Sequence, residues 1–416
     1  MARRVRPFRH FDGWLMLAVA CLFLLGILAI TSVNPPDATR QIVNLVPGAL
    51  AALFLVLYGH DWLDGKPAWV IYAICLVMLV AVDVFGHSAL GAQRWLQLGP
   101  LKIQPSEYAK LGLIVALSRA LALQNIQDPR GLTRAMAVVA FPALLVFKQP
   151  DLGTSLVFGA ITLGMLAWAG VSMAFLFRLV SPVLALILSF PFVLVNQPVV
   201  HRVVLWAVVL YLAGLGLWLW LDRRPAPLAR LVTWFANLGA SAAVPFAWAV
   251  LKEYQKNRIR TFIDPEADPL GAGYHVIQSK IAIGSGGLTG RGLFHGTQTQ
   301  LHFIPEQHTD FIYSVVGEEL GFLISLGMIA AYVTVLVRGL IIADRARDRF
   351  GSLLAVGIVT MLGFHMFVNL GMATGIMPVV GIPLPFMSYG GTALMTNLAA
   401  IGILQSISMR RQRGLY

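Results

Sequence analysis

Charged residues and cysteines are scarce in this chain, and each shortage excludes a class of protein. Only 12% of the 416 residues are charged, whereas about 25% is usual for a soluble domain. The two cysteines, Cys21 and Cys75, fall in apolar stretches, which excludes a disulfide framework and a cysteine-based metal cluster. The glycine-rich run at 284–292 lacks the Gly-Lys-Ser/Thr ending of a P-loop, which excludes that nucleotide site.

Apolar residues are abundant instead. Hydrophobic residues make up 58% of the chain and the mean hydropathy is +0.76, which indicates an all-α polytopic membrane protein. Runs of about 17 to 25 apolar residues can cross the hydrocarbon core. The sequence predicts about twelve such helices in a single integral membrane domain over 1–416, at 14–32, 41–59, 67–85, 107–123, 134–148, 154–172, 179–196, 203–221, 231–251, 311–336, 351–372 and 388–408.

Basic residues indicate how the chain is oriented. Arginines flank the first predicted span and the last one, and further clusters fall at 223–230 and 338–349. Because cytoplasmic loops carry an excess of Lys and Arg, we expect both termini in the cytoplasm and the loop 252–310 outside it. The first span is too long for a signal peptide and lacks a small-residue cleavage site, so we expect it to be retained. The same loops explain most of the net charge of +12, so no nucleic acid is expected as a partner.

The loop 252–310 is the longest polar excursion, and it carries basic residues where they are normally scarce. Lys256 and Arg258 lie in its first part. They are either a stop against lipid headgroups or an anion site suited to phosphate. The glycine run within the loop predicts a tight, reentrant segment in which the backbone approaches a neighbouring helix or a ligand.

Several ionisable residues fall within or beside predicted spans, where they should face the bundle interior. Glu107 and Lys110 are three residues apart on one helical face and can form an ion pair, either structural or functional. Asp151 is a candidate for a polar cavity or a cap for the next helix. Glu318 lies in a later span, beside Glu319. His365 is interpreted as a hydrogen-bonded bundle residue.

Several longer runs carry a resemblance to a known family. The sequence is similar to the shape, elongation, division and sporulation (SEDS) family, and within it more to RodA than to FtsW. The runs are Arg94-Trp95 with 105–107, 149–155, 264–275, 295–298, 305–311 and 385–391. They occur in order over nearly the whole chain. Family members have about ten spans, so the segment 174–230 is interpreted as an added pair of helices.

The resemblance implies a peptidoglycan glycosyltransferase that polymerises lipid II at the outer face of the bacterial cytoplasmic membrane during cell elongation. It places the family's essential acid at Asp268, as the general base that takes a proton from the acceptor sugar. Asp264 is the competing carboxylate, and an ordinary Asp-Pro turn is the alternative for both. The leaving undecaprenyl diphosphate would be stabilised by Lys256, Arg258 or a divalent cation such as Mg²⁺ or Mn²⁺.

Further substrate-binding positions carry over more loosely, with Glu107, Lys110, Asp151, His308 and Glu318 lining a polar groove. Arg94 is a candidate for phosphate contact, and Trp95 is either a sugar-stacking residue or an interfacial anchor. Expected partners are a class B penicillin-binding protein, which would cross-link the strands, and other elongation-complex membrane proteins. Two alternatives stay open, namely a lipid II flippase and a non-catalytic scaffold that activates the penicillin-binding protein.

Overall fold

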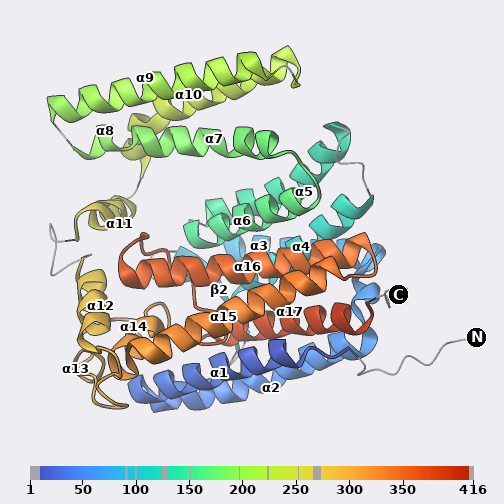
Figure 1. Ribbon diagram of the computed structural model, residues 1–416, viewed down its shortest axis with the longest axis vertical. Helices are drawn as coiled ribbons and strands as arrows, with labels where there is room; N and C mark the ends of the chain where they lie inside the picture. The colour runs from blue at the N-terminus through green and yellow to red at the C-terminus, as the bar shows by residue number, and fades with distance from the viewer. Residues whose placement is uncertain are drawn as a thin grey trace, which may run out of the picture. The chain divides into compact units, whose positions relative to one another are not determined.

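The computed structural model describes residues 10–89, 92–98, 101–123, 129–149, 151–195, 197–222, 224–251, 253–265 and 273–411 (Figure 1). Most of these residues are helical, which confirms the predicted fold class. The helices are α1 (Gly13–Val33), α2 (Pro35–Tyr58), the 3₁₀ helix η1 (His60–Leu63), α3 (Lys66–Phe85), α4 (Pro105–Leu123), α5 (Pro129–Lys148), α6 (Leu152–Trp168), α7 (Met173–Ser189), α8 (Pro191–Leu194), α9 (Pro198–Leu221), α10 (Pro227–Val250), α11 (Glu253–Ile263), α12 (Tyr274–Ser285), α13 (Thr297–Gln300), α14 (Ile312–Glu319), α15 (Gly321–Asp344), α16 (Arg349–Thr374) and α17 (Gly391–Met409).

Within the described ranges, ten helices are long and apolar enough to cross a membrane, so the chain is a multi-pass membrane protein. Two further predicted segments also form helices, α4 and α6, but neither is among these ten. Helix α6 is apolar yet has only 17 residues. Helix α4 carries Glu107 and Lys110 and buries most of its side chains within the protein. A helix surrounded by other helices can carry such groups because its neighbours satisfy them.

Two predicted spans are interrupted. The span predicted at 179–196 is divided between α7, which ends at Ser189, and α8, which begins at Pro191. The sequence predicted a continuous helix over 311–336, but α14 ends at Glu319 and α15 begins at Gly321, whose φ is +77°. Glycine is favoured there because the left-handed region is strained for other residues. The backbone of Gly290 also lies directly against Gly321 and leaves no room for a Cβ atom.

The glycine run at 284–292 is the segment that packs against this break. Its backbone bonds to both sides of it, with Arg291 N donating to Glu318 O at 3.0 Å and Phe322 N donating to Gly287 O at 2.9 Å. Gly287, Gly290 and Gly292 all have positive φ. The predicted close approach to a neighbouring helix is therefore confirmed.

The chain divides into two compact units, here named the first unit (1–169 and 269–416) and the second unit (170–268). In the first unit, α16 is the central helix and contacts α4, α6, α15 and α17, while α2 packs along α17 and α1 along α15 (Figure 1). In the second unit, α7 packs against α10 and α9. The segment 174–230, predicted as an addition to the family pattern, lies within the second unit.

Polar contacts hold the helices of the second unit together. The Asn237 amide of α10 donates to Ser181 Oγ of α7 at 2.9 Å, and Tyr211 OH of α9 donates to Asn237 Oδ1 at 2.9 Å. Arg178 and Asp222 form an ion pair at 3.3 Å. Such bonds are a common means of association between apolar helices, which gain little from burying more apolar surface in lipid.

A small sheet, which the sequence reasoning missed, occupies the loop between α3 and α4. Its strands are β1 (His87–Ala89), β2 (Ala92–Leu98) and β3 (Leu101–Ile103), in an antiparallel meander of order β1-β2-β3. Trp95 pairs with His87, and Leu96 pairs with Ile103.

The loops of the first unit gather at two ends. At one end, here named the loop end, segments 33–40, 151–153, 297–310 and 373–390 meet. Ser32 Oγ donates to Glu319 Oε1 at 2.7 Å, and Asn369 donates to Asp310 O and to Ile382 O at 2.9 and 2.8 Å. At the terminal end, residues 10–12, 57–66, 338–350 and 405–411 meet, as in the Arg338–Asp12 pair. The segments that meet at the loop end were all predicted to lie on one side of the membrane, and those at the terminal end on the other; the membrane sides themselves stay a prediction.

Candidate active site

The carboxylate predicted to be catalytic, Asp268, lies outside the described residues. The structure describes the chain up to Pro265 and again from Gly273. On the first side, α11 ends at Ile263, and the backbone N–H of exposed Asp264 bonds to Arg260 O at 2.9 Å. The segment with the candidate base thus joins α11 to α12.

The basic residues of this segment lie on α11. Lys256 Nζ bonds to Glu253 Oε1 at 2.9 Å and lies 6.0 Å from the centre of the Trp248 ring. The hydrogen bond from Lys256, followed by its charge, lowers the pKa of the exposed Glu253. Arg258 is exposed to solvent. Of the two predicted anion contacts, Lys256 already has an acidic partner and Arg258 is the more accessible.

Glu107 and Lys110 form the predicted ion pair, deep in the first unit. Lys110 Nζ lies 2.7 Å from Glu107 Oε1 and 3.2 Å from His365 Nε2, and all three residues are buried. Since an ammonium only donates, His365 Nε2 is the acceptor and its proton is on Nδ1. His365 is therefore a hydrogen-bonded residue inside the helix bundle, as predicted. The sequence did not predict its partner, Lys110 of α4.

Asp151 is the N-cap of α6. Its carboxylate accepts from Thr154 N at 3.2 Å and from Thr154 Oγ1 at 2.9 Å. The side chain is buried, and the adjacent Gly153 packs against the carbonyl of Val380. The capping alternative raised from the sequence describes its local geometry, and it places Asp151 at the loop end.

Glu318 is fully buried and saturated with hydrogen bonds. Its carboxylate accepts from Gln298 N at 2.8 Å, Thr299 N at 2.9 Å and Thr299 Oγ1 at 2.7 Å, so it holds the start of α13. The neighbouring Glu319 accepts from Ser32 and Gln300. Glu318 stands at the end of α14, beside the helix break, rather than within a long span.

His308 is the most accessible of the predicted groove residues at the loop end. Its Nε2 lies 3.7 Å from Asp37 Oδ2, and its ring lies 5.7 Å from that of Tyr389. Asp37 also accepts from Asn34 at 2.7 Å. Sequence reasoning missed Asp37 and Tyr389 because their partner lies more than seventy positions away along the chain, beyond the reach of any local pattern.

The remaining predicted residues are in the small sheet. Trp95 is half-buried in β2. Arg94 is in the same strand, but its side chain is outside the part of the chain that the structure describes. The sugar-stacking and interfacial-anchor interpretations of Trp95 both stay open.

Asp151, His308 and Glu318 thus all lie at the loop end, each bonded to different partners. Of the residues that the structure describes, no three His, Cys, Asp or Glu side chains converge there on a common metal position. The divalent cation predicted beside the diphosphate therefore stays a prediction.

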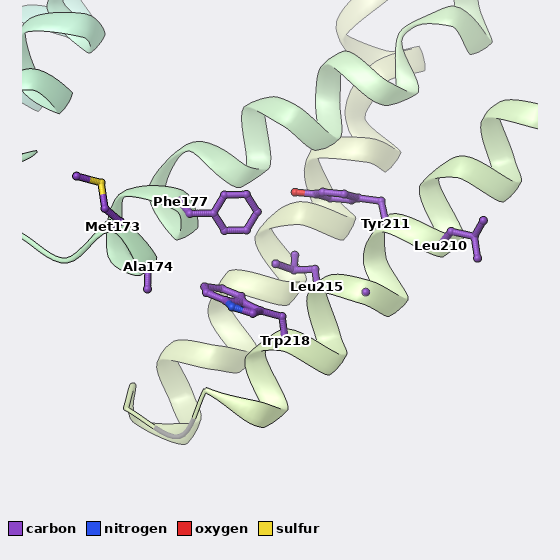
Figure 2. Close-up of a pocket in the computed structure, with 8 residues that line it drawn as sticks. Met173, Ala174, Phe177, Leu210, Tyr211, Leu215 and Trp218 are labelled. Atoms are coloured by element: carbon purple, nitrogen blue, oxygen red, sulfur yellow. The ribbon is translucent and has the colours of Figure 1, made fainter.

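The second unit has a groove of a different kind. Between α7 and α9 is a cavity of about 670 Å³ with apolar and aromatic walls, and Figure 2 shows Phe177, Tyr211 and Trp218 around it. Apolar side chains predominate in this groove, so it does not correspond to the predicted polar groove.

Comparisons with known proteins agree over nearly the whole chain. The FtsW, RodA and SpoVE family model, described as cell cycle protein, matches residues 13–207 and 197–413. The peptidoglycan glycosyltransferase MrdB of Escherichia coli (strain K12) is 38% identical over 409 residues, 97% of this chain and 95% of that protein. The peptidoglycan glycosyltransferase RodA of Treponema pallidum (strain Nichols) is 32% identical over 432 residues, 98% of this chain and 100% of that protein.

Solved structures support the same assignment. A chain from a structure on the coordination of polymerization and crosslinking by a peptidoglycan synthase complex has a TM-score of 0.70 and 31% identity, covering 96% of this chain and 98% of its own. The rod shape determining protein RodA of Thermus thermophilus has a TM-score of 0.64 and 26% identity, covering 98% and 99%. On sequence and fold together, the chain belongs to the FtsW/RodA/SpoVE family, the SEDS family.

Proposed function

We propose that this chain polymerises lipid II into glycan strands at the outer face of the bacterial cytoplasmic membrane, in cell elongation. The chain is a peptidoglycan glycosyltransferase, in accord with relatives of that name that are 32 to 38% identical over nearly its full length. That full-length similarity is the observation that carries the proposal. The preference for elongation over division rests on the RodA-like sequence of the segment 264–275.

In the proposed reaction, Asp268 is the general base. It takes the proton from the 4-hydroxyl of the acceptor sugar as that oxygen attacks the anomeric carbon of the lipid-linked donor, and the bond to undecaprenyl diphosphate breaks. A sugar hydroxyl is a weak nucleophile at neutral pH, so a positioned carboxylate lowers the barrier. The leaving diphosphate needs positive charge, which exposed Arg258, Lys256 or a divalent cation would supply.

The polar residues of the first unit divide into two groups by accessibility. Glu318 and Asp151 are buried and bonded to backbone N–H groups, which favours a role in holding segments 297–300 and 151–154 in place. His308 is partly exposed, with 24% of its side chain accessible, which favours direct contact with substrate. We assign Lys110 and Glu107 to the inner wall of the groove.

The proposed partner is a class B penicillin-binding protein. Support comes from the similarity to a chain of a peptidoglycan synthase complex that coordinates polymerization and crosslinking. Lipid II as substrate and other elongation-complex membrane proteins as further partners belong to the same proposal, as does a topology with both termini in the cytoplasm and the active site outside.

The test is a glycan assay with labelled lipid II, purified protein and partner. Asp268→Asn keeps the size of the side chain but removes the base, so we expect polymerisation to fall by about 10²- to 10⁴-fold with lipid II binding largely kept. Asp264→Asn, four residues earlier in the same segment, is the matched control and should polymerise normally.

Each alternative gives a different result in this assay. A flippase would yield no glycan with either protein form, and a scaffold would yield glycan from the partner regardless of Asp268. Normal synthesis by Asp268→Asn combined with loss in Asp264→Asn would move the base to Asp264.

A further inference from the structure

Three side chains of the kinds that bind metal ions lie close together at the terminal end. None of them is among the residues assigned to glycosyl transfer. They are His60 at the start of η1, Asp61 beside it, and Asp348 just before α16. Their ligand atoms lie within 4.8 Å of one another, the single such group of three or more in the residues that the structure describes. His60 Nε2 is 3.7 Å from Asp61 Oδ1 and 4.0 Å from Asp348 Oδ2.

His60 Nε2 is buried without a hydrogen-bond partner among the described residues. His60 is only 2% exposed. The distances to both carboxylates exceed the roughly 2.7–3.2 Å of an N–H···O bond. The other atoms of His60 are held, since its backbone N donates to Ser406 Oγ at 2.7 Å and its Nδ1 lies 3.3 Å from the same oxygen. In the tautomer with its proton on Nδ1, the lone pair of Nε2 lies on the side of the two carboxylates.

The surroundings leave room between these atoms. A Cβ atom added to Gly351 would lie 3.0 Å from His60 Nε2 and 3.4 Å from Asp348 Oδ1, so glycine keeps this side open. Asp348 Oδ1 is used as the N-cap of α16, accepting from Gly351 N at 2.7 Å. Its Oδ2 is the atom that faces His60.

We propose that His60, Asp61 and Asp348 bind a divalent transition-metal ion of the zinc class. Ligands at about 2.0–2.2 Å from a tetrahedral ion lie roughly 3.3–3.6 Å apart. The two separations from His60 Nε2, 3.7 and 4.0 Å, therefore need to close by only a few tenths of an ångström. The two carboxylates lie within 4.8 Å of each other, so they need to approach by at most about 1.5 Å. Both carboxylates can make that movement, because their side chains are 52% and 39% exposed. An imidazole ligand favours zinc or cobalt over magnesium, which prefers oxygen ligands and retained water.

The local charges are balanced. Arg347 and Arg410 oppose a cation at this position, and the two carboxylates offset them. Arg410 is held by other acceptors, since it donates to the carbonyl oxygens of Val56 and Leu57 at 3.1 and 3.0 Å and to Ser406 Oγ, behind the imidazole, at 3.0 Å. An ion of this class binds the neutral imidazole, through the ring nitrogen that does not carry the proton.

A bound ion would join segments distant in the sequence. Asp61 and His60 belong to the connection between α2 and α3, Asp348 to the start of α16, and Ser406 behind the imidazole to α17. Since the folded protein alone brings these ligands together, the ion should raise the unfolding temperature in proportion to the logarithm of its concentration.

The experiment uses the full chain in detergent micelles, treated with a chelator and then titrated with Co²⁺ alone. We expect the visible absorption of tetrahedral Co²⁺ at one ion per chain, displacement by Zn²⁺, and a higher unfolding temperature. Asp61→Asn, at an exposed position, and Asp348→Asn, which can still cap α16, should each weaken binding by at least about tenfold. His60→Gln should do so as well.

Asp64→Asn is the matched control. Asp64 lies in the same connection but pairs with Arg119 at 2.9 Å, outside the cluster, so this variant should bind Co²⁺ like the unaltered protein. Three results would overturn the proposal: no tetrahedral Co²⁺ spectrum, equal affinity in Asp61→Asn and Asp348→Asn, or the same loss in Asp64→Asn. Because every readout is ion binding or unfolding, the outcome is independent of the glycosyltransferase assignment.

Discussion

Lys110 is a charged residue enclosed by protein, and its surroundings explain how the fold tolerates it. The ammonium bonds to Glu107 and His365, and the three side chains are nearly inaccessible. A buried ion pair costs desolvation free energy that its own attraction roughly offsets, so its main effect appears when one partner is lost.

Removal of one partner should therefore be more harmful than removal of both. Lys110→Met leaves the Glu107 carboxylate buried and unpaired, and we expect it to reduce the free energy of unfolding by about 3–5 kcal/mol. The double variant Glu107→Gln/Lys110→Met should recover most of this loss. Unfolding of the three proteins in the same detergent measures both effects. A double variant as unstable as Lys110→Met would show that the packing of Lys110, and not its charge, is what the fold requires.

At the scale of elements, the break between α14 and α15 organises the loop end. At Gly321, which has a positive φ, the chain changes direction between α14 and α15, and the glycine run 284–292 packs beside this break. Glu318 and Glu319, at the end of α14, bond to α13 and to the end of α1. The interruption thus leaves these two carboxylates at the loop end, bonded to Thr299 of α13 and Ser32 of α1.

The break supplies a paired test. In Gly321→Ala the new methyl group meets Gly290 and the residue is strained at φ +77°, so we expect a loss of at least about 1–2 kcal/mol. Gly327→Ala, one to two turns further along α15, has open space around the new methyl group and should gain about 0.5–1 kcal/mol from reduced backbone freedom in the unfolded chain. The unfolding midpoints of the two variants measure the predicted loss and the predicted gain of stability. Equal midpoints would contradict the role given to Gly321.

At the scale of the whole molecule, the described loops of the first unit separate into two ends. The Asp12–Arg338 pair and the His60–Ser406 bond lie at one end, and the Asp37–His308 pair lies at the other. The arginine-rich connection at 345–349 belongs to the terminal end. By the positive-inside rule, that end should face the cytoplasm.

Cysteine labelling in intact cells measures this orientation. The chain has only two cysteines, so Cys21→Ala/Cys75→Ala provides a thiol-free background. Arg258→Cys and Arg347→Cys both replace exposed side chains. We expect a membrane-impermeant maleimide to label the first in intact cells and the second only after permeabilisation. Labelling of both, or the reverse order, would refute the proposed sidedness.

The sequence by itself determined the class of fold, the approximate position of most predicted spans and the i, i+3 pair of Glu107 and Lys110. These are local properties, because hydropathy and helical spacing depend on residues close together in the chain. Motif runs also carried the family resemblance. The positions of Asp268 and of the Arg94 side chain lie outside the described residues, so their predicted roles remain predictions.

The tertiary structure alone decided which distant residues meet. Ser32 bonds to Glu319, Lys110 to His365, and His60 faces Asp348, each pair separated by more than 250 positions. It also decided that the helix predicted over 311–336 breaks at Gly321, since the cause is the approach of Gly290 from another segment. A polar group buried among apolar helices must find a partner wherever the packing supplies one, and packing is set by the whole bundle rather than by neighbouring residues in the chain.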